Sequence, residues 1–139
     1  MTPFVLDAST TLSWHFKDEM TDHGRALARL AFKGAVTVPQ HWYLEVVSGL
    51  VRGERRSRTS PKVMDAFLAQ LGEMVIDIHE TDNMTLRKEI LPLARVHRLT
   101  VYDAVYLDLA RRLDLPLATL DVSLGNAARA VGVALIEGH

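Results

Sequence analysis

Cysteine is absent from the 139 residues of this sequence. A disulfide framework and a thiolate-bound zinc site are therefore excluded, and the composition suits a reducing compartment. The sequence also lacks any run of 18 apolar residues, so no membrane-spanning helix is expected. An acid, Asp7, stands where a secretory signal would need an apolar run, which favours a cytoplasmic location.

An excess of charge of one sign is lacking too, since the formal net charge is −1. This balance argues against a protein that grips nucleic acid with its whole surface, although it permits a local basic patch. Glycine loops of the GxxxxGK and GxGxxG types are absent, so nucleotide binding of those kinds has no support. The six histidines show no HExxH spacing, which argues against zinc-based catalysis.

The length and the apolar pattern predict one α/β domain over residues 1–139. With 48% apolar and 24% charged residues, the composition is that of an ordinary globular protein. Short runs that are apolar on both faces predict strands at 4–6, 36–38, 75–78, 117–120 and 133–136. Segments of helical period predict helices at 9–17, 20–33, 40–55, 61–74, 82–97, 102–112 and 122–131. Strands of this kind, alternating with helices, predict a three-layer α/β/α sandwich around a parallel sheet of four to five strands.

Two acids follow predicted strands directly. Asp7 comes after the first strand and Asp121 after the fourth, and each precedes a helix. In an open α/β sheet this is the carboxyl edge, where ligands bind. Each acid could instead be a helix N-cap, a role in which Asp is common. Because both would lie on one edge, they are more informative together than either is alone.

Asp103 and Asp108 fall on different sides of one predicted helix. Asp103 lies beside the apolar arc that contains Val105 and Tyr106, so its side chain should point toward the core. It also completes a capping-box pattern that begins at Thr100. Asp108 is expected on the opposite side, in a solvated ion pair with Arg112 four residues later.

Glu45 lies on the polar side of the helix predicted at 40–55. Its neighbours three and four residues away include no Lys or Arg, so a helical salt bridge with either is not available. A solvated surface Glu is the simple interpretation. If the fold gathers Asp7, Glu45, Asp103 and Asp121, however, their mutual repulsion would favour a hard cation among them. Mg²⁺ and Mn²⁺ prefer such oxygen ligands and can activate a water for attack on a phosphodiester.

Four motifs that contain these acids resemble the PIN domain, and in particular the VapC-type toxins of toxin–antitoxin pairs. They are residues 5–9 (VLDAS), 44–50 (LEVVSGL), 102–107 (YDAVYL) and 117–121 (LATLD). The resemblance spans essentially the whole chain. It implies a sheet of order 3-2-1-4-5, a Mg²⁺- or Mn²⁺-dependent RNA-cleaving site, a homodimer and an antitoxin partner.

By position in these motifs, the resemblance implies that Asp7, Glu45 and Asp103 are the core acids and that Asp121 is a fourth, more variable one. Ser9 and Thr119 correspond to small hydroxyl residues that orient ligands. Ser48 stands where such toxins commonly have Asn. It can still form a hydrogen bond, but its shorter side chain reaches less far.

A cluster of basic residues follows the acid of the third predicted helix. It contains Arg52, Arg55, Arg56, Arg58 and Lys62. These side chains could contact RNA phosphates, because guanidinium groups fit phosphate oxygens. An ordinary solvated loop is an equally good interpretation.

Three other functions are compatible with parts of the pattern. A phospho-receiver domain also gathers acids at a sheet edge, but it needs paired acids after the first strand and a Lys after the fifth, which this sequence lacks. A catalytically silent PIN-like module that binds RNA or protein would carry the same four acids. A DNA-directed nuclease of similar architecture is the third, and comparing RNA with DNA cleavage separates it from a ribonuclease.

Overall fold

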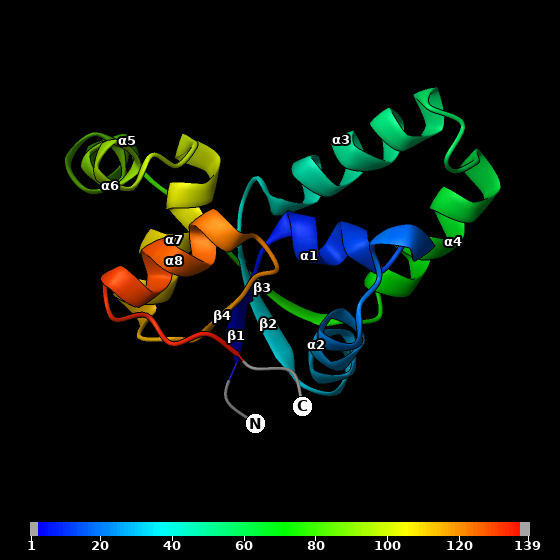
Figure 1. Ribbon diagram of the computed structural model, residues 1–139, viewed down its shortest axis with the longest axis horizontal. Helices are drawn as coiled ribbons and strands as arrows, with labels where there is room; N and C mark the ends of the chain where they lie inside the picture. The colour runs from blue at the N-terminus through cyan, green and yellow to red at the C-terminus, as the bar shows by residue number, and fades with distance from the viewer. Residues whose placement is uncertain (1–2, 137–139) are drawn as a thin grey trace.

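A parallel sheet of four strands forms the centre of the structure, a computed structural model that describes residues 3–136 (Figure 1). The strands are β1 Phe4–Leu6, β2 Ala35–Pro39, β3 Val75–His79 and β4 Leu117–Ala118, and they lie in the order β3-β2-β1-β4. In β1, Val5 pairs with Thr37 of β2 on one side and with Leu117 of β4 on the other. The expected parallel sheet is confirmed, as is the expected order of its first four strands.

The predicted fifth strand is reduced to a single pairing. Leu135 forms an isolated parallel bridge with Leu117. The N–H of Leu117 donates to Ala134 O at 2.8 Å, and the N–H of Ile136 donates to Leu117 O at 3.0 Å. Because β4 has only two residues, the ladder that it offers to a further strand is short.

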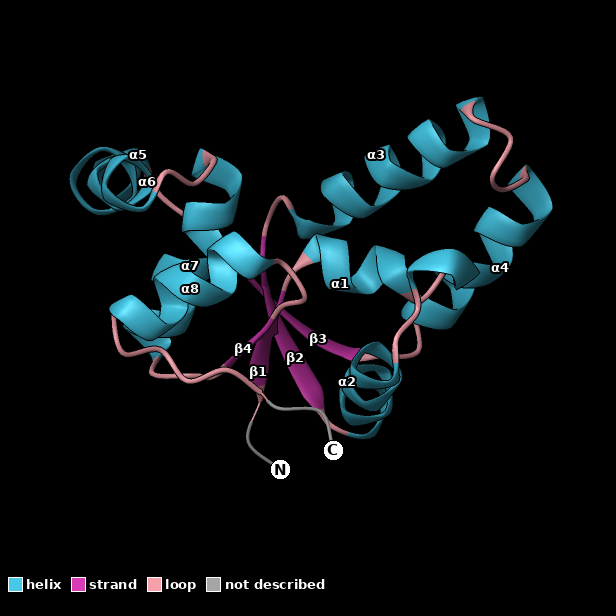
Figure 2. Cartoon of the chain, viewed as in Figure 1, coloured by secondary structure: helices cyan, strands magenta, loops and turns pink. Residues whose placement is uncertain are grey.

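Helices join successive strands and lie on both sides of the sheet (Figure 2). Between β1 and β2 come α1 Ala8–Ser13, the 3₁₀ turn η1 Lys17–Glu19 and α2 Asp22–Lys33, and between β2 and β3 come α3 Trp42–Arg55 and α4 Pro61–Leu71. The segment between β3 and β4 contains α5 Asn83–Thr85, η2 Leu86–Ile90, α6 Leu91–His97 and α7 Val101–Leu113, and α8 Val122–Ala130 follows β4. The predicted α/β/α sandwich is confirmed. Within residues 3–136, no helix is both long and apolar enough to cross a membrane.

The helix predicted at 82–97 is interrupted by a π-helical turn, η2. Pro92 stands at the start of α6 and has no N–H to donate to the carbonyl of Lys88. Regular α-helical bonding therefore cannot continue through this point, and Leu91 N–H bonds to Leu86 O instead. The amphipathic pattern alone did not reveal this change of geometry.

The central helix of the core is α7, which packs against β1, β2, α6, η2 and α8. Every residue from 104 to 110 is buried, so this helix has no solvated face along that stretch. Asp108 is consequently only 3% exposed. The expectation that it is solvated is wrong, because a helix enclosed by neighbours on all sides does not follow a two-sided wheel. The expected pairing with Arg112 is present at 3.4 Å, and Arg111 lies 3.7 Å from the other carboxylate oxygen.

Strand β3 is less covered than its apolar sequence predicted. Val75 is 66% exposed and Ile78 is 62% exposed. In the described part of the chain, the strand lies at the edge of the sheet and pairs with β2 alone. Apolar residues on both faces therefore do not mean burial on both faces here.

Two helical segments rise on opposite sides of the sheet's carboxyl edge, with α3 and α4 on one side and α5 and α6 on the other (Figure 1). The end of α3 is packed tightly onto the segment after α1. A Cβ atom at Gly53 would lie 2.5 Å from Cζ of Phe16, whose side chain is buried. A glycine at this point thus permits the close approach of α3 to the Phe16 ring.

Gly53→Ala should lower the free energy of unfolding by about 1–3 kcal/mol, because the added methyl group must displace a buried aromatic ring. Gly125→Ala is the matched control in another helix, since its Cβ would meet only Leu135 Cδ1 at an ordinary 3.5 Å. That control should be stabilised by about 0.5–1 kcal/mol. Urea unfolding followed by tryptophan fluorescence measures both. A Gly53→Ala protein as stable as the wild type would contradict the packing described.

Candidate active site

The carboxylate of Asp7 is buried at the carboxyl end of β1, with 2% of the residue exposed. Its Oδ1 accepts a hydrogen bond from the N–H of Thr10 at 2.9 Å, which caps α1. Its Oδ2 accepts from Ser9 Oγ at 3.1 Å and from Thr119 Oγ1 at 2.5 Å. Burial raises the pKa of Asp7, while these hydrogen bonds act in the opposite direction. The N-cap interpretation is confirmed for Asp7, and its carboxylate lies at the carboxyl end of β1, where the site is predicted.

Thr119 connects Asp7 with a second acid, Asp121. Besides donating to Asp7, the Thr119 hydroxyl oxygen accepts from the N–H of Asp121 at 3.0 Å. Asp121 is exposed and caps α8, with Oδ1 accepting from Leu124 N–H at 2.8 Å. The hydroxyls of Ser9 and Thr119, two residues selected from the sequence, thus both donate hydrogen bonds to Asp7.

Asp103 lies in the first turn of α7 and is partly buried. Its N–H donates to Thr100 Oγ1 at 3.1 Å, so the predicted cap at Thr100 is present. The pKa of Asp103 is raised to about 6, first by burial and then by the charges of Asp121, Asp7 and Glu45 in that order. Because Asp103 senses all three other acids, the fold has brought the four carboxylates into one electrostatic neighbourhood.

Glu45 joins this neighbourhood from α3 and is held there by a residue of α7. The hydroxyl of Tyr106 donates to Glu45 Oε1 at 2.8 Å. Burial, followed by the nearby Glu45 carboxylate, raises the pKa of Tyr106, so the phenol stays protonated as a donor. His41 Nε2 lies 3.1 Å from the same oxygen, but this contact lacks hydrogen-bond geometry, and the buried nitrogen has no other partner among residues 3–136. Both neighbours thus face Oε1.

Tyr106 and His41 were not selected from the sequence. Tyr106 falls on the apolar arc of its predicted helix, and its ring is indeed only 1% exposed. A buried tyrosine hydroxyl usually needs a polar partner, and that rule was the available signal. His41 lies one residue before α3. Its ring contacts the rings of Tyr102 and Tyr106 edge-on, and its centre lies 5.4 Å and 5.1 Å from theirs.

The four carboxylates are suited to a hard divalent cation by their chemistry, since all their donors are oxygen. Among residues 3–136, no three or more acidic or histidine side chains are placed so that they could hold one ion together. One oxygen of Asp7 and one of Asp121 are engaged in helix caps. A single ion held by three of these acids would therefore need a different placement of their carboxylates.

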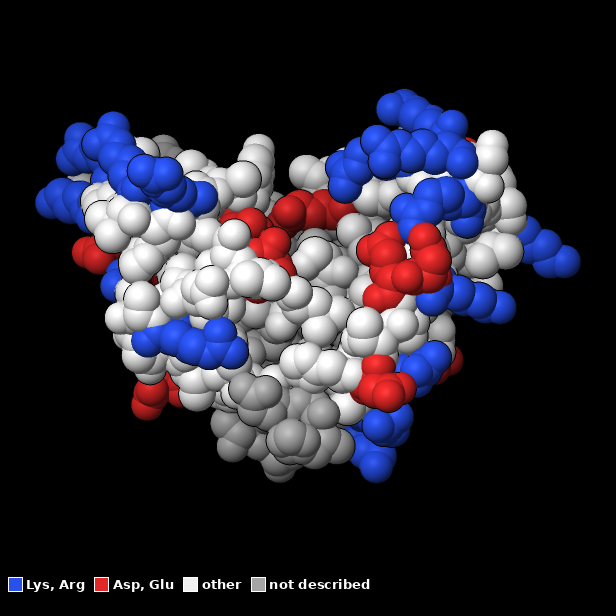
Figure 3. All heavy atoms as spheres, in the orientation of Figure 1, with Lys and Arg blue, Asp and Glu red and all other residues white. Residues whose placement is uncertain are grey.

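Basic side chains lie on both sides of the acidic hollow, as Figure 3 shows. On the α3–α4 side, all five residues of the predicted cluster are exposed, namely Arg52, Arg55, Arg56, Arg58 and Lys62. On the η2–α6 side, the exposed basic residues are Arg87, Lys88 and Arg95. The second group was not selected from the sequence, because it lies far along the chain from the acid motifs. Ser48 is exposed and accepts from Arg52 Nη1 at 3.3 Å, without contacting an acid.

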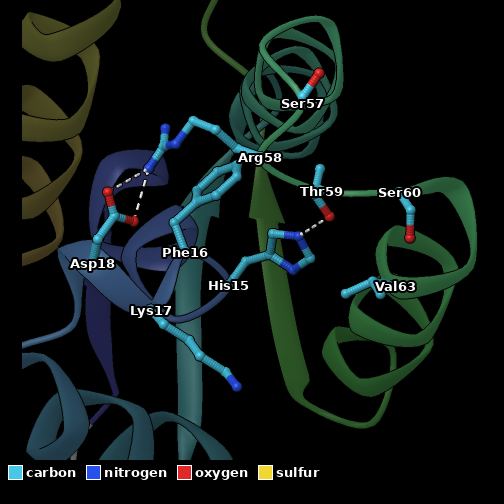
Figure 4. A pocket seen from close by; sticks show the side chains of 9 residues that line it. All are labelled: His15, Phe16, Lys17, Asp18, Ser57, Arg58, Thr59, Ser60 and Val63. Atoms are coloured by element: carbon cyan, nitrogen blue, oxygen red, sulfur yellow. Dashed lines mark hydrogen bonds and ion pairs between the residues drawn. The ribbon is translucent and has the colours of Figure 1, made fainter.

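Arg58 differs from the rest of its cluster because it is already paired (Figure 4). Its Nη2 contacts Asp18 Oδ1 at 2.9 Å and Glu19 Oε2 at 2.8 Å, and its guanidinium lies 4.3 Å from the centre of the Phe16 ring. Close by, His15 Nε2 is 2.7 Å from Thr59 Oγ1. His15, Phe16, Asp18, Arg58 and Thr59 line a hollow of about 720 Å³. Arg58 connects the α3–α4 turn to η1 through its contacts with Asp18 and Glu19.

The fold and the site define an α/β/α protein in which two acids that follow β1 and β4, and two acids from α3 and α7, lie at the carboxyl edge of a parallel sheet. Residues 4–130 match the PIN domain, and the chain therefore belongs to that family. PIN domains are in general nucleases that use divalent metal ions.

A solved structure supports the fold independently. The crystal structure of PAE2754 from Pyrobaculum aerophilum is similar with a TM-score of 0.66 and 22% sequence identity, over 91% of this chain and 86% of that chain. At this identity the likeness concerns the fold alone. The comparison with curated proteins found no match.

In the metal-free protein, the Asp103 carboxyl group should titrate with a pKa of about 6 rather than the ordinary 3.8, as followed by the signal of its carboxyl carbon. Asp121→Asn should lower this value, because Asp121 is the largest charge contribution after burial. Carbon-detected NMR titration measures both. Asp65→Asn, which removes an exposed acid on α4, is the control and should leave the titration unchanged. A wild-type Asp103 that titrates near 4 would show that the four acids do not interact.

Proposed function

We propose that this protein is a Mg²⁺- or Mn²⁺-dependent endoribonuclease of the cytoplasm that acts as the toxin of a toxin–antitoxin pair. The observation that carries the proposal is the hydrogen-bonded placement of the acids in a PIN domain, where Thr119 joins Asp7 to Asp121 and Tyr106 holds Glu45. Four acids within electrostatic range of one another are unfavourable for a purely structural role. Membership of the PIN family makes nuclease chemistry the natural use of such a cluster.

The proposed ligands are Asp7, Glu45, Asp103 and Asp121. A bound Mg²⁺ or Mn²⁺ would supply a Lewis acid and an activated water for hydrolysis of the phosphodiester. Asp7 provides a fixed reference point, because three donors hold its two oxygens. Tyr106 anchors Oε1 of Glu45, and His41 lies beside the same oxygen, so neither of these neighbours occupies Oε2.

Proton exchange at Asp103 sets a pH requirement. Its carboxyl, with a pKa of about 6, releases its proton as the pH rises through that value. The site gains its full negative charge only above it.

The basic residues on both sides of the hollow favour a polyanionic substrate. Arg52, Arg55 and Arg56 on one side and Arg87 and Lys88 on the other are exposed. Opposite charge on the two flanks would draw a nucleic acid strand across the acids, where the metal ion would offset their repulsion of phosphate. RNA is proposed as the substrate from the resemblance to toxins of this family.

An antitoxin that inserts a cation, such as Arg, among the four acids is also proposed, together with a homodimer. The gathering of four carboxylates supports the first idea, because it favours a complementary positive group. The homodimer rests on the resemblance alone. Addition of the antitoxin should stop RNA cleavage, and replacing its inserted Arg by Ala should restore it. A tightly bound partner that leaves cleavage unchanged would contradict this arrangement.

Asp7→Asn should abolish most cleavage while preserving the fold. Asn caps a helix about as well as Asp, and loss of a buried charge whose pKa is raised should leave the melting temperature level or higher. Cleavage should fall by more than about 100-fold, because even outer partners of metal ligands typically contribute about 10–100-fold. The assay follows labelled single-stranded RNA and DNA against Mg²⁺ and Mn²⁺ concentration.

Two controls complete this experiment. Asp65→Asn removes an exposed acid outside the cluster and should cleave like the wild type. Excess EDTA should stop the wild-type reaction. Undiminished cleavage in EDTA, or wild-type cleavage by Asp7→Asn at every metal concentration, would refute the site. Faster cleavage of DNA than of RNA would refute the proposal that RNA is the substrate.

A further inference from the structure

A second hollow lies directly beside the carboxylates, between α1, α3 and the start of α7. Its volume is about 390 Å³, within the range of about 300–1,000 Å³ typical of small-ligand sites. The residues that give it chemical character are Ser9, Leu44, Glu45, Ser48, Arg52 and Tyr102. Glu45 belongs to the acid cluster and Ser9 donates to Asp7, so the hollow is continuous with the proposed site of hydrolysis.

Two apolar side chains stand exposed on the rim of this hollow. Leu44 is 71% exposed and Tyr102 is 60% exposed. Both also line another hollow of about 650 Å³ on their other side, so they form a wall between two depressions. The Tyr102 ring is steadied by its edge contact with His41 at 5.4 Å. An exposed aromatic ring in a fixed position is a stacking platform for a nucleic acid base.

The polar side of the hollow offers complementary groups. Arg52 donates to Ser48 Oγ at 3.3 Å, and in the described part of the chain no carboxylate pairs with its guanidinium. The guanidinium is thus free to contact a phosphate or a base edge. Ser9, whose proton is donated to Asp7, can accept a hydrogen bond from a ligand, and Ser48, which accepts from Arg52, can donate one. A ring, a cation and two hydroxyls around a space of this size match one nucleotide.

We infer that this hollow is a nucleotide subsite, in which the base next to the scissile phosphate stacks on Tyr102 and its phosphate contacts Arg52. The inference rests on the proposed function and extends it to recognition of the substrate. A strand whose phosphate lies at the carboxylates has its next nucleotide within reach of the hollow, because the two are covalently joined. Single-stranded RNA suits this arrangement, since its bases are free to leave the stack.

The same wall could instead meet a protein segment, because Leu44 and Tyr102 are both apolar. The polar and cationic groups favour the nucleotide. A protein side chain seated on an apolar wall would not need Arg52, Ser48 and Ser9 around one nucleotide-sized space. The two occupants give different results in the experiment below.

Binding of a labelled single-stranded RNA hexamer is measured by fluorescence anisotropy at low salt in excess EDTA, where the metal-dependent reaction cannot proceed. Tyr102→Ala should weaken binding by about 5- to 150-fold, the usual effect of removing one stacking partner. Tyr102→Phe keeps the ring and should bind within about twofold of the wild type. Tyr43→Ala is the matched control, since Tyr43 is 49% exposed on α3 but does not line the hollow.

A second measurement needs no protein variant. Hexamers that carry one abasic nucleotide, moved stepwise along the strand, should lose affinity for the wild type at one position. Tyr102→Ala should be insensitive to an abasic nucleotide at that position. This cycle assigns the lost affinity to contact between one base and one ring.

Equal affinities of Tyr102→Ala and Tyr43→Ala, or no abasic position that matters, would overturn the subsite. Unchanged RNA affinity with lost binding of the antitoxin would assign the wall to a protein contact instead. RNA binding that depends on Tyr102, without cleavage in Mg²⁺ or Mn²⁺, would refute the proposed enzyme and leave the subsite standing. Cleavage that is indifferent to Tyr102 would refute the subsite alone.

Discussion

The hydrogen bonding of the buried Asp7 carboxylate is the interaction on which the rest of the site depends. A charge that is 2% exposed is tolerated only with good hydrogen bonds, and Asp7 receives them from Thr10, Ser9 and Thr119. Through Thr119, the bond ties β1 to β4, and the same hydroxyl orients the backbone of Asp121. The helix cap and the proposed metal ligand are therefore two uses of one side chain. Because Asp7 is held in place, its negative charge acts on Asp103 from a fixed position and raises the pKa of that residue.

The charge distribution follows from this arrangement. The acids gather where parallel strands end, while basic side chains lie on the helices that rise at either side (Figure 3). The formal net charge of −1 hides this separation, because the total sums opposite charges from different places. Arg58 shows that the cluster is not uniform, since its pairing with Asp18 and Glu19 makes it part of the scaffold. Arg52, in contrast, faces the hollow beside the acids.

Much of the fold could be predicted because strand and helix periods differ clearly in this sequence. The acids Asp7 and Asp121 could be placed at one edge, since each directly follows a predicted strand. The burial of Asp108 could not be predicted, because α7 is enclosed on all sides by segments that are distant in the chain. The bond from Tyr106 to Glu45 spans 61 residues, and no local pattern encodes it. The exposure of β3 is likewise a product of tertiary context, whereas the π turn η2 lies beside Pro92, a local feature that the amphipathic period does not register.

The most direct test of the central claim is where Mn²⁺ binds. Paramagnetic Mn²⁺ broadens NMR signals of nearby nuclei, so a titration with substoichiometric Mn²⁺ maps the ion on the folded protein without any substrate. If the four carboxylates form one site, the backbone amide signals of Asp7, Ser9, Glu45, Asp103 and Asp121 should broaden first, and excess Mg²⁺ should restore them. Broadening that begins instead at Asp18 and Glu19, or at other surface acids, would contradict the account.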